Sequence, residues 1–241
     1  MNGIEKKAIL FDKDGTLIEY NSIWPDATRA MIPYFREKFE VKENIGDEEL
    51  LKRLGVDEEK VKDCTAIASG TSFDIAEVLK QSLKNSNQDT LRFVREYFYQ
   101  YTIENNKAIK AIGDVKKLFA RLKQADIRIG IVTADDYDST LFALKQLEVE
   151  ELVEFIATGD RYEAKPAVEA IEAFSAVIKI PRDQILFIGD SIIDMQFARH
   201  CHKGIAVLSG VGEEGELIQY TDAIYPTIHE IPYERFLERE F

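Results

Sequence analysis

Four short apolar runs stand out along the chain, and each of them ends in a small or polar residue. They cover residues 8–12, 127–135, 184–190 and 204–210, and a weaker fifth run covers 154–160. The runs are rich in β-branched residues and do not alternate with polar positions, a pattern typical of strands in a parallel sheet that is covered on both faces. We therefore predict that they form a buried sheet.

Helical patterns lie between these runs. Apolar residues recur at spacings of three and four in the segments 114–125, 138–147, 166–178 and 192–201. Strands that alternate with helices through short links are typical of an open sheet with helices on both faces. The predicted fold class is therefore α/β, with a doubly wound, mainly parallel sheet.

The stretch from residue 20 to residue 105 interrupts this alternation. It shows helical patterns only, at 24–39, 47–55, 73–83 and 89–105. Roughly eighty residues without a strand exceed a normal crossover connection. We predict an inserted all-helical cap domain at 20–105, and a core domain formed by 1–19 and 106–241. The alternative is that these helices pack directly on the sheet.

The composition supports one core with a smaller insert. The chain has 241 residues, of which 45% are hydrophobic. Its two cysteines, Cys64 and Cys201, cannot make a disulfide framework, and the first residues contain no apolar stretch long enough for a signal peptide or a membrane span. We expect a cytoplasmic protein, and the oligomeric state stays open between monomer and homodimer.

The charge balance narrows the range of partners. The formal net charge is -13, from 44 acidic and 31 basic side chains, so the chain lacks the positive field that nucleic acid or an anionic membrane would need. We expect neither as a partner. An anionic substrate must instead be held by local positive groups or by a metal ion.

Polar side chains stand at the ends of three predicted strands. Asp12 and Asp14 end the first strand, Thr133 lies near the end of the second, and Asp190 ends the strand that begins near residue 184. One such aspartate is often only a helix cap or a turn former. The carboxyl ends of parallel strands, however, meet at one edge of the sheet, which is where ligands bind in doubly wound folds. We expect these groups to lie together.

Carboxylates gathered in this way repel one another unless a cation lies among them. A few hard oxygen ligands, completed by water, suit Mg²⁺ bound together with a phosphate group. One carboxylate can then attack phosphorus while a second protonates the leaving oxygen. The pattern therefore indicates phosphoryl chemistry at this edge.

Four motifs resemble the signature of the haloacid dehalogenase superfamily. They are FDKDGTLI at 11–18, IVTAD at 131–135, AKPA at 164–167 and IGDSIIDM at 188–195, in the order that the family has. The resemblance covers the whole chain, and the helical insert is similar to that of the phosphoglycolate-phosphatase-like branch. It implies a Mg²⁺-dependent phosphatase that acts on a small phosphorylated metabolite.

The resemblance also implies roles for individual residues. Asp12 would be the nucleophile that forms an aspartyl-phosphate, and Asp14 the general acid and then the base. Thr133 and Lys165 would hold the phosphoryl oxygens. Mg²⁺ would be bound by the Asp12 carboxylate, the main-chain carbonyl of Asp14 and Asp190.

Three neighbouring residues are expected to support this site. Asp194 lies one helical turn after Asp190 and can face the same side. Gly15 allows a sharp turn beside the phosphate position, and Thr16 can hydrogen-bond the carboxylates or the turn itself.

The cap carries weaker signals. The polar turn at 68–74 could place Gly70, Thr71 and Ser72 over the site as a specificity loop. The plainer interpretation is that Thr71 or Ser72 caps the next helix. Trp24 could line the site or pack at the hinge of the cap.

An acidic cluster directly follows Thr133. Relatives more often have a neutral residue after this motif, so Asp135, Asp136 and Asp138 count against a substrate with an additional negative charge near this edge. Helix capping by Asp136 or Asp138 is the simpler interpretation. The glycine-rich run at 210–215 is interpreted as a loop near the same edge, because Glu213 and Glu214 would oppose a dinucleotide.

Three functions stay open from the sequence. The first is hydrolysis of a phosphate monoester, with phosphoglycolate as the leading substrate. The second is a phosphomutase of the β-phosphoglucomutase type, which passes the phosphoryl group to a sugar. The third is a non-catalytic phosphate-binding module, because a fold alone does not establish a function.

Overall fold

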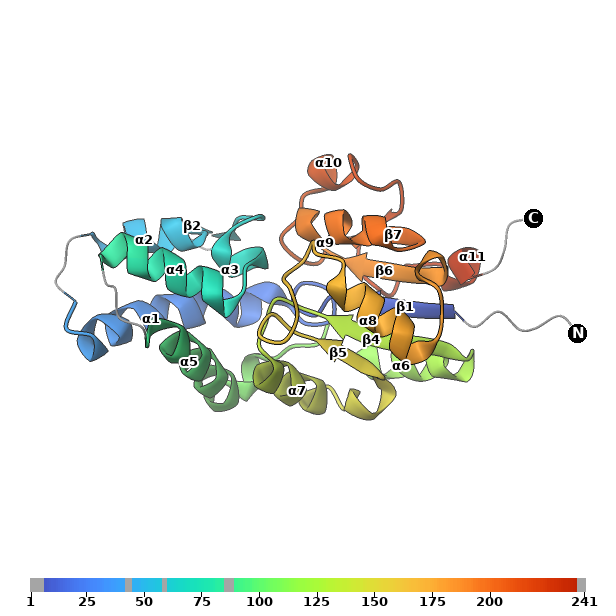
Figure 1. Ribbon diagram of the computed structural model, residues 1–241, viewed down its shortest axis with the longest axis horizontal. Helices are drawn as coiled ribbons and strands as arrows, with labels where there is room; N and C mark the ends of the chain where they lie inside the picture. The colour runs from blue at the N-terminus through green and yellow to red at the C-terminus, as the bar shows by residue number, and fades with distance from the viewer. Residues whose placement is uncertain (1–6, 42–44, 58–59, 85–88, 238–241) are drawn as a thin grey trace, which may run out of the picture.

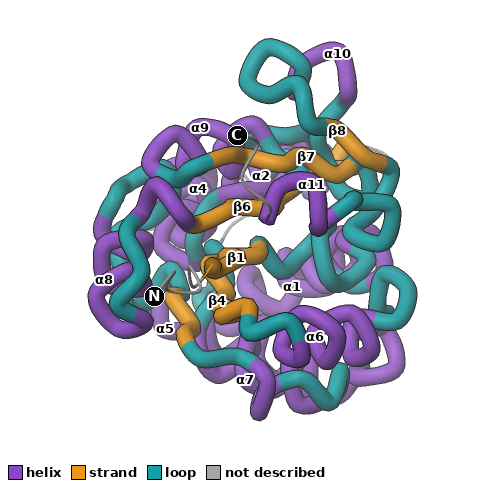
Figure 2. The backbone as a smooth tube through the Cα atoms, turned by 90° about the vertical axis from the view of Figure 1, so that its right-hand side faces the viewer, coloured by secondary structure: helices purple, strands orange, loops and turns teal. Residues whose placement is uncertain are grey.

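A six-stranded sheet forms the centre of the larger part of the molecule (Figure 1). The computed structural model describes residues 7–41, 45–57, 60–84 and 89–237. The strands lie side by side in the order β5-β4-β1-β6-β7-β8, and every neighbouring pair is parallel. Figure 2 shows β4, β1, β6, β7 and β8 following one another across the molecule. Their bounds are β1 Lys7–Phe11, β4 Ile127–Val132, β5 Phe155–Ala157, β6 Ile185–Gly189, β7 Lys203–Val207 and β8 Ile224–Tyr225.

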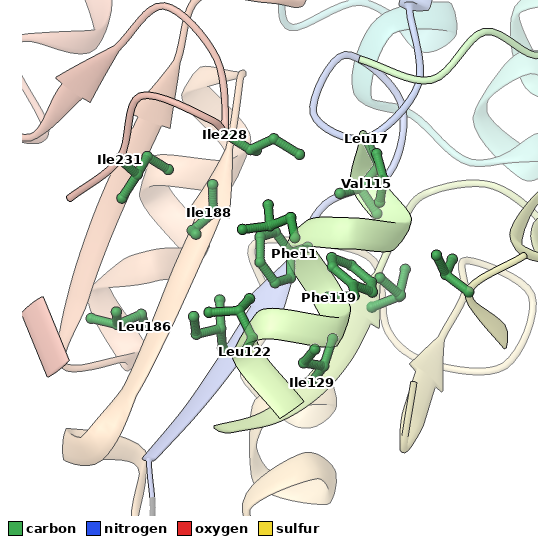
Figure 3. Packing of buried hydrophobic residues seen from close by; sticks show 14 of the residues in the cluster. Phe11, Leu17, Val115, Phe119, Leu122, Ile129, Leu186, Ile188, Ile228 and Ile231 are labelled. Atoms are coloured by element: carbon green, nitrogen blue, oxygen red, sulfur yellow. The ribbon is translucent and has the colours of Figure 1, made fainter. Parts of the chain in front are cut away.

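Helices cover both faces of this sheet. Alternate residues of β1 enter different hydrophobic clusters: Ile9 and Phe11 pack with α6, α7 and α11, whereas Ala8 and Leu10 pack with α8, α9 and α10. Phe11 meets Phe119 of α6 at a ring-centroid distance of 5.1 Å, at the centre of the first cluster (Figure 3). The helices are α6 Val115–Gln124, α7 Tyr137–Gln146, α8 Glu169–Ile178, α9 Ile192–Phe197, α10 Glu214–Leu217 and α11 Tyr233–Leu237. The predicted α/β fold class is confirmed.

The helices of the predicted cap form a second body beside the sheet (Figure 1). Their bounds are α1 Trp24–Lys38, α2 Asp47–Leu54, α3 Ala66–Ser69, α4 Ser72–Leu83 and α5 Thr90–Glu104. All fully buried members of their hydrophobic cluster lie between Tyr20 and Phe98. This separate core argues against helices that pack only on the sheet. We propose the domain boundaries at 19/20 and 105/106 on this basis.

One detail of the predicted all-helical cap needs correction. A short antiparallel pair, β2 Val56–Asp57 and β3 Lys60–Val61, follows α2. Gly55 ends α2 in a left-handed conformation, with φ of 110°, and so turns the chain into this pair. Two-residue strands carry no recognisable periodicity, which is why the sequence pattern did not predict them.

Smaller differences concern element bounds. Strand β8 was not predicted, again because it has only two residues. Helix α8 begins at Glu169 rather than at Pro166, because the chain first makes a hydrogen-bonded turn from Ala164 to Ala167. Helix α9 ends early and continues as a 3₁₀ turn at Ala198–His200. The part of the chain that the structure describes has four others, at Tyr20–Ser22, Asn106–Ala108, Glu150–Leu152 and Arg182–Gln184. Within the described ranges, no helix has both the length and the apolarity to cross a membrane.

Candidate active site

The register of the sheet brings the predicted strand-end residues to one edge. Phe11 pairs with Ile131 on one side and with Ile188 on the other, so β1, β4 and β6 end at the same level. The Asp12 main-chain N–H donates to the Ile188 carbonyl at 2.8 Å, and that of Thr133 donates to Ala157 at 3.0 Å. Asp12, Thr133 and Asp190 are all buried there.

Three of the carboxylates form a compact acidic cluster. Asp12, Asp190 and Asp194 each offer an oxygen, and these oxygens lie within 4.8 Å of one another. Burial raises the pKa of Asp12 to about 7, although Lys165 opposes this rise; the charge of Asp194 adds a smaller rise. Burial and the charges of Asp12 and Asp194 likewise raise the pKa of Asp190 well above its ordinary value. Hard, buried oxygens that destabilise one another are a donor set that fits Mg²⁺.

Asp190 is held in place from two directions. Thr16 Oγ1 donates to one carboxylate oxygen at 3.2 Å, and the main-chain N–H of Val211 donates to the other at 2.8 Å. Gly15 has φ of 88°, and a Cβ at this position would lie 2.5 Å from Asp190 Oδ2. Glycine is therefore required here both by backbone conformation and by the close approach of the carboxylate.

Lys165 lies beside the predicted nucleophile. Its Nζ is 2.6 Å from Asp12 Oδ1 and 2.6 Å from Asp194 Oδ1, and only 7% of its side chain is exposed. Burial lowers the pKa of Lys165, but the Asp12 and Asp194 carboxylates outweigh burial and raise it. The site thus contains a fixed positive charge next to Asp12, where the sequence predicts a phosphate ligand.

Asp194 lies between the start of α9 and Lys165. Its Oδ2 accepts from Ser191 Oγ at 2.7 Å, within a capping box that begins α9, while its Oδ1 contacts Lys165. The carboxylate therefore links the start of the helix after Asp190 to the lysine.

Asp14 has a different environment from Asp12. The indole N–H of Trp24 donates to Asp14 Oδ1 at 2.9 Å, and Lys13 Nζ is 2.5 Å from Asp14 Oδ2. Lys13 is 1% exposed, and its Nζ also lies 3.1 Å from Asp135. The Asp14 carboxylate is not one of the three that form the compact acidic cluster. A carboxyl group held apart in this way is suited to proton transfer.

A small cavity separates this edge from the cap. It measures about 50 Å³, room for roughly three to five water molecules. The residues of the sheet edge and its loops that line it include Asp12, Asp14, Thr133, Lys165, Asp190 and Asp194. The large cap side chains opposite are Tyr20, Trp24, Ile67, Ile75 and Phe98. Trp24 packs against Phe98 at a ring-centroid distance of 5.4 Å. Trp24 therefore both lines the site and packs in the cap.

The predicted specificity loop is divided between two roles. Gly70 and Ser72 line the cavity, whereas Thr71 caps α4 through a capping box with Asp74. Ser72 Oγ donates to Asp136 Oδ2 at 2.6 Å, which connects the cap to the core. The plainer interpretation, a helix cap, therefore holds for Thr71.

The acidic residues after Thr133 have separate partners. Asp135 pairs with Lys13, and burial raises its pKa to about 6 although Lys13 opposes the rise. Asp136 stands at the N-cap position of α7, but its side chain makes no capping bond and contacts Ser72 and Arg95 instead. The interpretation of Asp136 as a side-chain cap is wrong, because the carboxylate turns toward the cap domain.

Several contacts at the site were not predicted from the sequence. The loop at 210–215 lies near the active-site edge as predicted, but its N–H bond to Asp190 depends on main-chain geometry that no residue type encodes. Asp63 of the cap accepts from the Ile192 N–H at 2.8 Å, at the start of α9. The Lys13–Asp135 pair had one signal, a lysine placed two residues after a mostly buried strand.

A family model and a named protein both match most of this chain. The family model of haloacid dehalogenase-like hydrolases matches residues 9–207. A protein of Caldanaerobacter subterraneus named "Putative pyrophosphatase PpaX" is 26% identical over 193 residues, which are 80% of this chain and 76% of that protein.

Solved structures show the shared fold. A predicted phosphoglycolate phosphatase from Haemophilus somnus has a TM-score of 0.66 at 19% identity, with 94% of this chain and 96% of that chain covered. A HAD hydrolase of family IA, variant 3, from Entamoeba histolytica has a TM-score of 0.69 at 19% identity, with coverage of 96% and 98%.

Proposed function

The chain belongs to the haloacid dehalogenase-like hydrolase family, and from that premise we propose that it is a Mg²⁺-dependent phosphatase acting on a small phosphorylated metabolite. The observation that carries this proposal is the buried Asp12 carboxylate, held beside Lys165 and within the cluster that includes Asp190. We assign Asp12 as nucleophile, Asp14 as acid and base, and Thr133 with Lys165 as phosphate ligands.

The proposed reaction has two balanced steps. An Asp12 oxygen attacks phosphorus, the bond to the leaving oxygen breaks, and that oxygen takes the proton of Asp14. A water molecule then attacks the aspartyl-phosphate, Asp14 takes a proton from it, and the bond between Asp12 and phosphorus breaks. Inorganic phosphate leaves, and both aspartates return to their starting protonation states.

The metal position follows from the same residues. Asp12, Asp190 and the main-chain carbonyl of Asp14 would hold Mg²⁺, which supplies charge neutralisation for phosphoryl transfer when bound. Lys165 contributes a second positive charge at Asp12, and its contacts with Asp12 and Asp194 keep it from turning to solvent. The protein's own contribution is therefore positioning and electrostatic stabilisation.

The alternative is a phosphomutase, which would pass the phosphoryl group to a sugar. Release of stoichiometric inorganic phosphate without a bisphosphate activator would count against it. A non-catalytic module is disfavoured because every residue that the reaction needs lies at this edge. The two cysteines are unpaired, which agrees with the cytoplasmic location that we propose.

Phosphate release is the direct test. Purified protein should release inorganic phosphate from small phosphate monoesters when Mg²⁺ is present, and EDTA should abolish the release. Asp12→Asn should lower kcat by at least about a thousandfold, because it removes the nucleophile. Normal turnover by this variant would disprove the assignment.

A further inference from the structure

We propose that the cavity selects a substrate whose leaving group is short and uncharged, a proposal that rests on the proposed phosphatase function. The names of similar proteins suggest phosphoglycolate or pyrophosphate, and both carry a second anionic group beside the reacting phosphoryl group. The residues that would face that second group in this chain are neutral or acidic.

The charged residues of the cavity lining are mostly acidic and disfavour a second anionic group. Among the described residues, its lining contains one lysine and no arginine, but five carboxyl groups: Asp12, Asp14, Asp135, Asp190 and Asp194. The single lysine, Lys165, already contacts two of these carboxylates. The proposed Mg²⁺ and Lys165 are needed for the phosphoryl group itself, so a second anion would be buried without a partner charge.

The cap side of the cavity presents apolar side chains to the leaving group. Ile67, Ile75 and Phe98 are buried and apolar, and they offer no hydrogen bond. A carboxylate or phosphate placed against them would lose its water and gain nothing in exchange. An alkyl group would instead bury apolar surface there.

The polar side chains of the cap do not change this conclusion, because their donors are already used. Trp24 Nε1 donates to Asp14 at 2.9 Å, and Ser72 Oγ donates to Asp136 at 2.6 Å. Tyr20 Oη donates to the Ile67 carbonyl, and Ser69 Oγ donates to Asp63 at 3.2 Å. Among the described residues on the cap side of the lining, no side-chain donor is therefore left for an anionic leaving group.

Two cationic side chains near the cavity, Lys13 and Arg95, already pair with carboxylates outside the leaving-group position. Lys13 does not line the cavity, and its ammonium contacts Asp14 and Asp135. Arg95 also lies outside the lining, with its Nε 3.5 Å from Asp136 Oδ1. The arrangement therefore specifies one dianionic phosphoryl group joined to a short neutral group.

The test compares substrates of similar size and different charge. Propyl phosphate and phosphoglycolate both lose a primary alkoxy group that leaves as the alcohol, but only the latter carries a carboxylate. With Mg²⁺ present, we expect kcat/KM to be at least about tenfold higher for propyl phosphate, with most of the difference in KM. Pyrophosphate should also show the higher KM.

A charge added to the cavity supplies the matched control. Ala68 lines the cavity on α3 and is partly exposed, so A68K can place an ammonium group there, and A68Q adds a neutral side chain. We expect A68K to reduce the preference for propyl phosphate at least about fivefold through a lower KM for phosphoglycolate, whereas A68Q keeps it. Circular dichroism melts establish that both variants fold.

The outcomes separate this inference from the proposed function. Hydrolysis of phosphoglycolate or pyrophosphate with a KM equal to or below that of propyl phosphate would overturn the inference and leave the phosphatase function intact. An unchanged preference in folded A68K would overturn it as well. If no substrate released phosphate with Mg²⁺, the proposed function itself would be contradicted.

Discussion

At the scale of single residues, the two aspartates of the first motif are distinguished by their partners. Asp12 contacts Lys165 and shares the acidic cluster, whereas Asp14 accepts from Trp24 and pairs with Lys13. The motif predicted that Asp12 and Asp14 lie at one edge, but not this difference. The contacts of Trp24 and Lys13 arise from tertiary packing, which no local pattern specifies.

The Trp24 contact leads to a prediction about the acid. Trp24→Phe removes the indole donor but keeps an aromatic ring, so Asp14 loses one of its two partners. We expect kcat to fall about tenfold for phenyl phosphate, the effect of one lost hydrogen bond. The loss should be smaller for p-nitrophenyl phosphate, whose leaving group needs less protonation.

Steady-state kinetics on these two substrates, which are close in size, decide the point. Tyr101→Phe, which alters an aromatic residue of α5 outside the cavity lining, is the control for a general effect on the cap. Equal losses on both substrates would show that Trp24 does not act through Asp14.

At the scale of elements, the strand ends were predictable and the loops between them were not. Parallel strands bring their carboxyl ends to one edge whatever lies between them, so Asp12, Thr133 and Asp190 could be grouped from the sequence. The strands of two residues carry no periodicity, and the start of α8 depends on a turn that apolar spacing does not encode. The turn at Gly15 was predicted, but its close contact with Asp190 was not.

Gly15 lies so close to the Asp190 carboxylate that a side chain at this position should disturb the site. In Gly15→Ala, the added Cβ would meet Asp190 Oδ2 at 2.5 Å, at a backbone φ of 88°. We expect the free energy of unfolding to fall by about 1–3 kcal/mol, and Mg²⁺ affinity to fall at least about tenfold. Gly215→Ala is the control, because nothing lies within 4 Å of a Cβ at that position. Calorimetric titration with Mg²⁺ that gave the same affinity for both variants would contradict this account.

At the scale of the whole molecule, folding gathers five carboxyl groups around one cavity in a chain that is already strongly acidic. Burial and neighbouring carboxylates raise the pKa of Asp190 above its ordinary value of 3.8. The stability that this group contributes is therefore present below pH 3.8 and is lost as pH rises through the raised pKa. Without a metal ion, the site destabilises the folded protein at neutral and alkaline pH.

Because the ionised Asp190 carboxylate destabilises the folded protein, removing its charge should raise the melting temperature. In EDTA at pH 8, Asp190→Asn should melt about 3–8 °C above the unchanged protein, and the gain should shrink at pH 5. Mg²⁺ should raise the melting temperature of the unchanged protein and not that of the variant. Asp222→Asn is the control: Lys203 lowers the pKa of Asp222, so this variant should melt no higher than the unchanged protein at either pH, and Mg²⁺ should still raise its melting temperature. Differential scanning fluorimetry at both pH values suffices, and a gain independent of pH would contradict the account.

We propose above all that Asp12 carries the phosphoryl group during turnover. The most direct measurement is rapid acid quenching of the Mg²⁺-loaded protein with ³²P-labelled p-nitrophenyl phosphate, followed by mass spectrometry of the peptides. We expect a transient acyl phosphate on the peptide that contains Asp12, and no label on Asp12→Asn. Turnover without label on Asp12, or label on another residue, would contradict it.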